Sequence, residues 1–158
     1  SRVFPHETGL NVLPDKSGPE VLQHPNFIAP VDVTVEGADE QARVKRPEEV
    51  AAEDKIVDIG PDTVQTIAPH ILESNFILWN GPTGLYEDGF IHYTNAIAQV
   101  IAERVAQGAR CVIGGGDTIA AIQASGFDET KLGFLSTGGG AMLEYLLRGS
   151  LPGIDALA

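Results

Sequence analysis

Two runs of three consecutive glycines constrain the fold of this chain more than any other feature. The glycines at 114–116 follow the apolar segment 110–113, and those at 138–140 follow the apolar segment 132–135. Residues with helical spacing come after each run, at 119–124 and 141–148. Because glycine allows tight turns and close approach of the backbone, the pattern predicts two units in which a strand leads through glycines into a helix.

Two earlier segments repeat this order of strand and helix. A predicted strand at 55–59 leads through Gly60 into an amphipathic helix that Pro69 is expected to kink, and a strand at 76–79 precedes a long loop and a helix ended by Gly108. Strands that alternate with amphipathic helices are typical of a parallel sheet with helices on both faces. We therefore expect a Rossmann-like α/β fold, as an incomplete three-layer α/β/α domain.

The segment before residue 55 fits this order less well. Residues 1–26 show no helical or strand period, and we interpret them as an irregular lead-in or truncated segment. The apolar residues from Phe27 to Val35 predict a strand broken at Pro30. The charged segment 37–54 predicts a solvated loop or a short hairpin.

Charge and composition argue against several classes of partner and location. The 158 residues contain 10 Lys and Arg against 22 Asp and Glu, and a formal net charge of −12 repels nucleic acids and anionic membranes. Apolar runs stay well below the roughly 20 residues of a membrane span, and no signal-peptide pattern is present. A single cysteine, Cys111, leaves no internal disulfide, so a cytoplasmic location is expected.

The glycine runs also predict where a ligand would bind. In parallel α/β sheets ligands bind at the carboxyl ends of the strands, and both runs and the loop at 81–84 fall at that edge. Amides at helix starts bind anions, so the pattern favours a phosphate site over tight turns alone. The P-loop and Gly-x-Gly-x-x-Gly motifs are both absent, so a nucleotide site here must be of another kind.

Several side chains beside these glycines have two interpretations. Asp117 could hold Mg²⁺ that bridges polyphosphate oxygens, or it could cap the helix that begins there. Thr118 likewise could bind phosphate or act as the cap. Glu87 could accept ribose hydroxyls or be a solvated loop residue, and Pro82 and Leu85 could contact a base or only pack the loop.

Other reactive residue types favour ordinary structural roles. The four histidines, at positions 6, 24, 70 and 92, lack the spacing of metal ligands. Cys111 lies within an apolar strand and is expected to be a small buried hydrophobe. Trp79 is expected to lie in the core.

Three motifs in one order resemble the C-terminal domain of phosphoglycerate kinase: Trp79-Asn80-Gly81-Pro82-Thr83-Gly84-Leu85-Tyr86-Glu87, Gly114-Gly115-Gly116-Asp117-Thr118, and Ser136-Thr137-Gly138-Gly139-Gly140-Ala141. The resemblance runs from about Ile28 to the end of the chain. It implies that residues 27–158 are the C-terminal part of a nucleotide-binding domain. It further implies a glycolytic ATP:3-phospho-D-glycerate 1-phosphotransferase, monomeric at full length, with Mg²⁺ and ATP or ADP on this domain. The 3-phosphoglycerate or 1,3-bisphosphoglycerate would bind mainly on an N-terminal domain absent here.

The resemblance implies a role for each residue that matches a motif. Glu87 would bind the ribose, Pro82 and Leu85 would contact the nucleotide, and Asn80 would contact the polyphosphate. The phosphate and Mg²⁺ segment would comprise Gly115, Gly116, Asp117 and Thr118, with Asp117 as the metal ligand. The catalytic amides, which meet the transferring phosphoryl group, would be those of Gly138, Gly139 and Gly140.

Departures from the family pattern limit this expectation. Tyr93 precedes Thr94 where the family usually has glycine, so the helix that begins there could sit differently. The catalytic arginine and the glycine–lysine segments of the family are absent, so the 158 residues are expected to be inactive alone. The alternatives are a non-catalytic nucleotide- or phosphate-binding α/β module and an unrelated α/β domain. Missing strands would leave a sheet edge unpaired, which predicts association.

Overall fold

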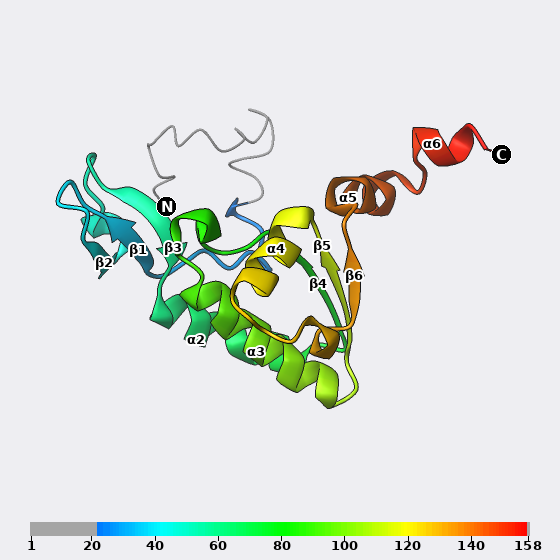
Figure 1. Cartoon of the computed structure of the whole chain (residues 1–158), viewed down its shortest axis with the longest axis horizontal. Coiled ribbons are helices and arrows are strands. Elements are labelled where there is room, and N and C mark those ends of the chain that lie inside the picture. The colour runs from blue at the N-terminus through cyan, green and yellow to red at the C-terminus, as the bar shows by residue number, and fades with distance from the viewer. Residues whose placement is uncertain (1–21, 158) are drawn as a thin grey trace. The chain divides into compact units, whose positions relative to one another are not determined.

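The computed structural model describes residues 22–157, in two compact units that divide within one helix, between Ile67 and Ala68 (Figure 1). The predicted lead-in at 1–26 therefore falls largely outside the described residues. Helices and strands follow the order β1 (Val33–Glu36), β2 (Ala42–Lys45), η1 (Pro47–Glu49), β3 (Lys55–Ile59), α2 (Pro61–Glu73), β4 (Phe76–Asn80), η2 (Tyr86–Asp88), α3 (His92–Ala106), β5 (Arg110–Gly114), α4 (Gly116–Ala124), η3 (Glu129–Lys131), β6 (Phe134–Ser136), α5 (Gly139–Arg148) and α6 (Pro152–Asp155). Within residues 22–157, every helix is too short or too polar to cross a membrane.

The first unit contains a small antiparallel sheet. Its strand order is β2-β1-β3, and β1 pairs antiparallel with both neighbours. The segment 37–54, predicted to be a loop or a short hairpin, supplies only one strand of a hairpin: β2 pairs with β1, which lies before this segment. The assignment of 55–59 to the parallel sheet was wrong, because β3 pairs with β1, where Val35 and Val57 are buried together with Val33.

The predicted strand at the start of this unit was also too long. Phe27 is 39% exposed and lies outside any strand, and β1 begins only at Val33. Pro30 has no N–H for a sheet, and the amides of Val31 and Asp32 donate instead to Thr63 Oγ1, at 3.0 and 3.1 Å. The backbone before β1 is therefore tied to the first turn of α2.

Asp32 completes this link as a buried carboxylate. Its oxygens accept hydrogen bonds from the amides of Asp62 and Thr63 and from the Thr63 hydroxyl. Burial by itself would raise the pKa of Asp32, but these hydrogen bonds outweigh it, so the pKa lies below its usual value. Asp32, just before β1, thus satisfies first-turn amides of α2 about thirty residues later in the chain.

The second unit contains the parallel sheet, with strand order β4-β5-β6. Alternate strand residues, including Cys111 and Ile113, are buried on the face that α3 and α4 cover. Burial raises the pKa of Cys111 to about 11, so the thiol stays protonated and acts as a hydrophobe, as expected. Trp79 is only half-buried, and its Nε1 donates to the carbonyl of Gly81, so its expected place in the core was wrong.

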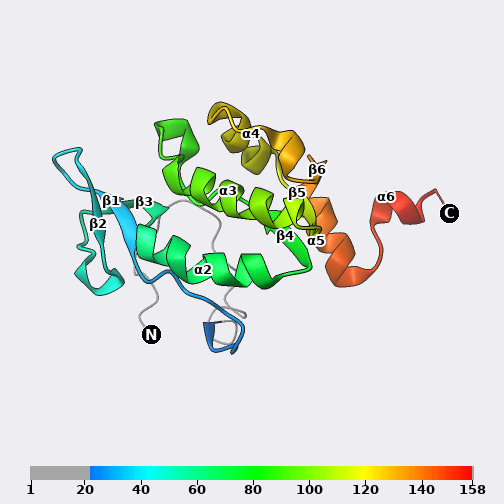
Figure 2. The ribbon, with the colours of Figure 1, turned by 90° about the horizontal axis from the view of Figure 1, so that it is seen from below.

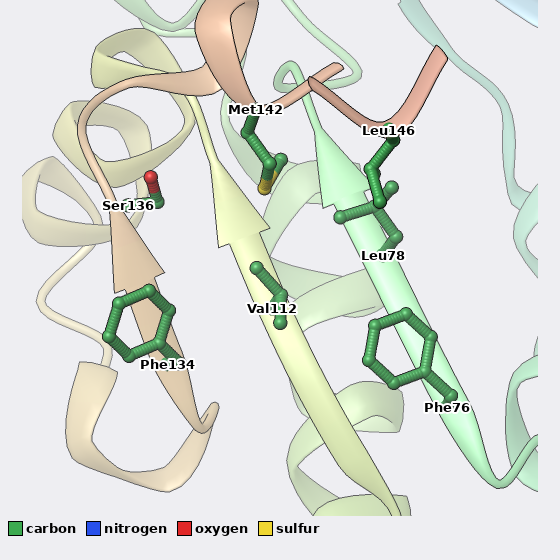
Figure 3. Close-up of a pocket in the computed structure, with 7 residues that line it drawn as sticks. All are labelled: Phe76, Leu78, Val112, Phe134, Ser136, Met142 and Leu146. Atoms are coloured by element: carbon green, nitrogen blue, oxygen red, sulfur yellow. The ribbon is translucent and has the colours of Figure 1, made fainter. Parts of the chain in front are cut away.

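The opposite face of this sheet is covered in part by α5. Figure 3 shows Met142 and Leu146 of α5 near Leu78, toward the arrowhead ends of the strands, whereas Phe76, Val112 and Phe134 lie farther down the strands. Phe76 and Phe134 remain 57% and 67% exposed. Helices therefore lie on both faces of an α/β sheet, as predicted, but one face is incompletely covered.

Candidate functional site at the carboxyl edge of the parallel sheet

Three loops meet where the parallel strands end. Asn80, Gly114 and Ser136 occupy matching positions on β4, β5 and β6, and the Gly115 amide donates to the Ser136 carbonyl at 3.0 Å. The structure therefore brings the Asn80–Gly84 loop and both glycine runs to one edge, as the sequence predicted (Figures 1 and 2).

Both helices at this edge begin inside the glycine runs. The N-cap of α4 is Gly115, with φ of 94°, so neither Asp117 nor Thr118 is the cap that the sequence predicted. Gly115 takes that place because its positive φ turns the strand directly into the helix. The first helical hydrogen bond of α4 joins Ile119 N to Gly115 O, and that of α5 joins Met142 N to Gly138 O. The three preceding amides of each helix lie outside the helical ladder and attract anions.

Half of the six glycines make room for protein atoms. A Cβ at Gly114 or Gly115 would lie 2.9 or 3.1 Å from Asn80 Oδ1. A Cβ at Gly139 would lie 2.6 Å from the Gly115 Cα and closer still to Asn80 Oδ1. These three glycines form a cradle for the carboxamide of Asn80, which we call the Asn80 cradle.

The other three glycines border open space. A Cβ at Gly116 or Gly140 would meet no heavy atom within 4 Å, and one at Gly138 would meet only Ser136 Oγ at 3.8 Å. Gly116 and Gly140 are exposed first-turn residues of α4 and α5. Room for a ligand therefore exists beside Gly116 and Gly140, whereas the Asn80 cradle is occupied by the Asn80 side chain.

Thr118 connects two of the loops from beneath. Its side chain is fully buried, its hydroxyl donates to the Gly114 carbonyl at 2.9 Å, and it accepts from the Gly81 amide at 2.7 Å. The sequence identified Thr118 as a phosphate ligand or a cap, and it contained no sign of the bond to Gly81.

A second threonine pair holds the loop that follows β4. Thr94 in the first turn of α3 is fully buried, and its hydroxyl accepts from the Thr83 amide at 3.1 Å and lies 3.0 Å from the Thr83 hydroxyl. Pro82 and Leu85 are half-buried in this loop. Sequence reasoning missed the threonine pair, because a separation of eleven residues has no local period.

The charged side chains of the site are acidic. Glu87 and Asp117 are exposed, and burial of the phenol together with these two carboxylates raises the pKa of Tyr86. Both carboxylates therefore lie close enough to act on the same side chain. Within residues 22–157, His, Cys, Asp and Glu form no group of three or more that could hold a metal ion alone.

The fold and this edge define an incomplete α/β domain, with a parallel sheet between helices and glycine-rich helix starts at the carboxyl edge of the sheet. A sequence model described as phosphoglycerate kinase matches residues 20–149. The chain belongs to the phosphoglycerate kinase family, whose members are kinases of glycolysis, and the alternative of an unrelated α/β domain was therefore wrong.

Individual relatives agree with this family and show how much of it the chain represents. Phosphoglycerate kinase of Chlorobaculum tepidum is 45% identical over 135 residues, which cover 83% of this chain and 34% of the relative. That of Streptomyces avermitilis is 34% identical over 169 residues, covering 96% and 41%. The structure of phosphoglycerate kinase from Coxiella burnetii matches with a TM-score of 0.69 at 37% identity, covering 81% and 32%. The chain thus spans 34% and 41% of the length of these two curated relatives.

Proposed function

We propose that residues 27–158 are the C-terminal part of the nucleotide-binding domain of a cytoplasmic phosphoglycerate kinase, and that this part binds Mg²⁺ with ATP or ADP. The observation that supports the proposal best is the meeting of two helix starts, each with an open glycine, beside Asp117 at one sheet edge. Phosphoglycerate and bisphosphoglycerate are, in this proposal, substrates of the longer protein.

The phosphates would bind the first-turn amides of α4 and α5. Amides of Gly116, Asp117 and Thr118 would receive one part of the polyphosphate, and those of Gly140 and its neighbours would receive the transferring phosphoryl group. Mg²⁺, when bound with the nucleotide, would neutralise charge on the phosphate oxygens. Because these amides are fixed before the reaction, they can stabilise charge that develops on the phosphoryl oxygens without reorganising.

Asn80 and the glycines of its cradle fit the same scheme. Its Oδ1 lies among Gly114, Gly115 and Gly139, while the residue as a whole is exposed. The amide nitrogen is then the part of the side chain that remains for a polyphosphate contact.

The nucleoside would bind the loop between β4 and α3. Pro82 and Leu85 supply half-buried apolar surface, and the exposed carboxylate of Glu87 can accept hydrogen bonds from ribose hydroxyls. The Thr83–Thr94 contacts hold this loop against α3.

Removal of the Asp117 carboxylate tests the nucleotide site. We expect Asp117→Asn to weaken Mg-ADP binding about tenfold or more in calorimetry, because a charge-assisted ligand is lost. In EDTA, without Mg²⁺, Asp117→Asn should bind ADP more tightly than the parent chain, because asparagine does not repel the phosphates as the carboxylate does. Glu103→Gln removes the same charge from the far half of α3 and should leave both affinities unchanged. Equal Mg-ADP affinity of Asp117→Asn and the parent chain would contradict the metal role.

Turnover by the 158 residues alone should be absent. Lys and Arg are absent from 56 to 103. Arg104 bonds to the Ser74 carbonyl, and Arg148 pairs with Glu144. In this proposal, cationic side chains that stabilise a transferring phosphoryl group come from the rest of the longer protein. A coupled assay should detect no Mg-ATP-dependent phosphorylation of 3-phosphoglycerate, with the whole Chlorobaculum tepidum enzyme as positive control. Clear turnover would refute this part of the proposal, whereas binding without turnover in a longer chain would favour the non-catalytic module.

A further inference from the structure

We infer that the hydroxyl of Thr118 positions the two halves of the nucleotide site relative to each other and does not itself bind the phosphates, whereas the Thr118 amide keeps the phosphate contact proposed above. The buried hydroxyl joins the nucleoside loop, 81–89, to the phosphate loop, 114–118. The inference rests on the proposed function, since it concerns how one nucleotide is held by both loops.

The hydroxyl is committed to protein partners on both sides. Thr118 is fully buried, and its only hydroxyl proton is donated to the Gly114 carbonyl four residues earlier. That bond alone is ordinary for threonine in a helix. The acceptor side of the same oxygen takes the Gly81 amide at 2.7 Å, from a residue 37 positions away. This second bond crosses from one loop to the other.

Gly81 is the point at which the nucleoside loop leaves the sheet. It directly follows β4, and its φ of 104° is open mainly to glycine. The backbone there has few conformational limits of its own, so the hydrogen bond from its amide to Thr118 restricts the direction in which the loop starts. Pro82, Leu85 and Glu87 all follow that point.

The phosphate loop is fixed independently of the nucleoside loop. The Gly115 amide donates a hydrogen bond to the Ser136 carbonyl, and Gly139 packs closely against the backbone of Gly115. Loss of the Thr118 hydroxyl should therefore leave each loop able to bind its own part of a ligand. What is lost is the fixed distance between the nucleoside loop and the phosphate loop. That fixed distance lets Mg-ADP, once bound at one loop, reach the other at a high effective concentration.

Separate ligand parts distinguish coupling from direct contact. We would measure the binding of Mg-ADP, adenosine and Mg-pyrophosphate to the 158-residue chain by ligand-observed NMR and calorimetry. Thr118→Val keeps the shape but lacks the hydroxyl, and should weaken Mg-ADP about tenfold while adenosine and pyrophosphate change less than about twofold. Thr118→Ser keeps the hydroxyl and should restore Mg-ADP affinity. Hydrogen exchange of the Gly81 amide should be fast in the valine variant and slow in the serine variant.

Each other outcome decides against the inference or against the proposed function. Coupling would be overturned if Thr118→Val left the Mg-ADP affinity unchanged. It would also be overturned if Thr118→Val weakened Mg-pyrophosphate binding as much as Mg-ADP binding. If Thr118→Val does not fold, hydrogen exchange of the Gly81 amide tests the inference. Fast exchange in the parent chain or in Thr118→Ser would overturn the inference, and slow exchange in both would support it. If the folded parent chain binds none of the three ligands, the proposed function fails, while Gly81 exchange still tests the bond.

Discussion

Gly139→Ala should strongly destabilise the parallel-sheet unit, whereas Gly140→Ala, one residue later, should leave its stability unchanged or slightly higher. A Cβ at Gly139 would lie 2.6 Å from the Gly115 Cα, and backbone at the end of β5 cannot rotate out of the way. Overpacking of this kind costs about 1–3 kcal/mol or more. A Cβ at Gly140 meets open space, and alanine in a helix gains roughly 0.5–1 kcal/mol over glycine.

Thermal and urea unfolding followed by circular dichroism would measure this difference. At about 2–4 °C per kcal/mol for a chain of this size, Gly139→Ala should lower Tm by several degrees relative to Gly140→Ala. Removal of Asn80 Oδ1 in Asn80→Ala should lessen the cost of Gly139→Ala only in part, because the clash with Asn80 disappears while those with the Gly115 N and Cα remain. Equal stability of the two glycine variants would show that Gly139 is not packed in the Asn80 cradle.

The second unit was predictable from the sequence to a considerable extent. Apolar runs located β4, β5 and β6 within two residues, because each short strand is bounded by a loop with glycine. The same reasoning placed β3 in the wrong sheet. A short apolar run shows that a segment is extended, but its partner depends on burial, here Val57 against β1, which no local spacing reports.

The candidate site was predictable as a place but not as a set of contacts. Gly114 and Gly139 look the same in the sequence as Gly116 and Gly140. What separates packed from open glycines is tertiary packing, by the Asn80 and Met142 side chains and by the Gly115 backbone. The role of Thr118 was hidden for a similar reason, since its bond to Gly81 depends on two parallel strands ending side by side.

The 158-residue chain should associate through the open face of the parallel sheet. This face consists of Phe76, Leu78, Val112 and Phe134, with Met142 and Leu146 of α5 above them, around a groove of about 250 Å³ (Figure 3). Parallel sheets are normally buried on both faces, yet both phenylalanines are more than half exposed. Exposed apolar patches larger than a few hundred Å² mark interaction surfaces. Within residues 22–157, α5 contacts this sheet and leaves both phenylalanines exposed, so a second copy of the isolated chain can cover the rest of the face.

Sedimentation equilibrium should therefore show reversible self-association at micromolar concentration, lost or weakened at least tenfold in Phe76→Ser/Phe134→Ser. Leu157→Ser is the matched control, because Leu157 is 90% exposed but lies beyond α6, outside this face. Association that persists unchanged in the double variant would point instead to pairing along an edge strand, β4 or β6, since the row of amides and carbonyls on such an edge does not depend on side chains. A monomer at all concentrations would mean that the net charge of −12 opposes contact more strongly than the exposed apolar surface favours it.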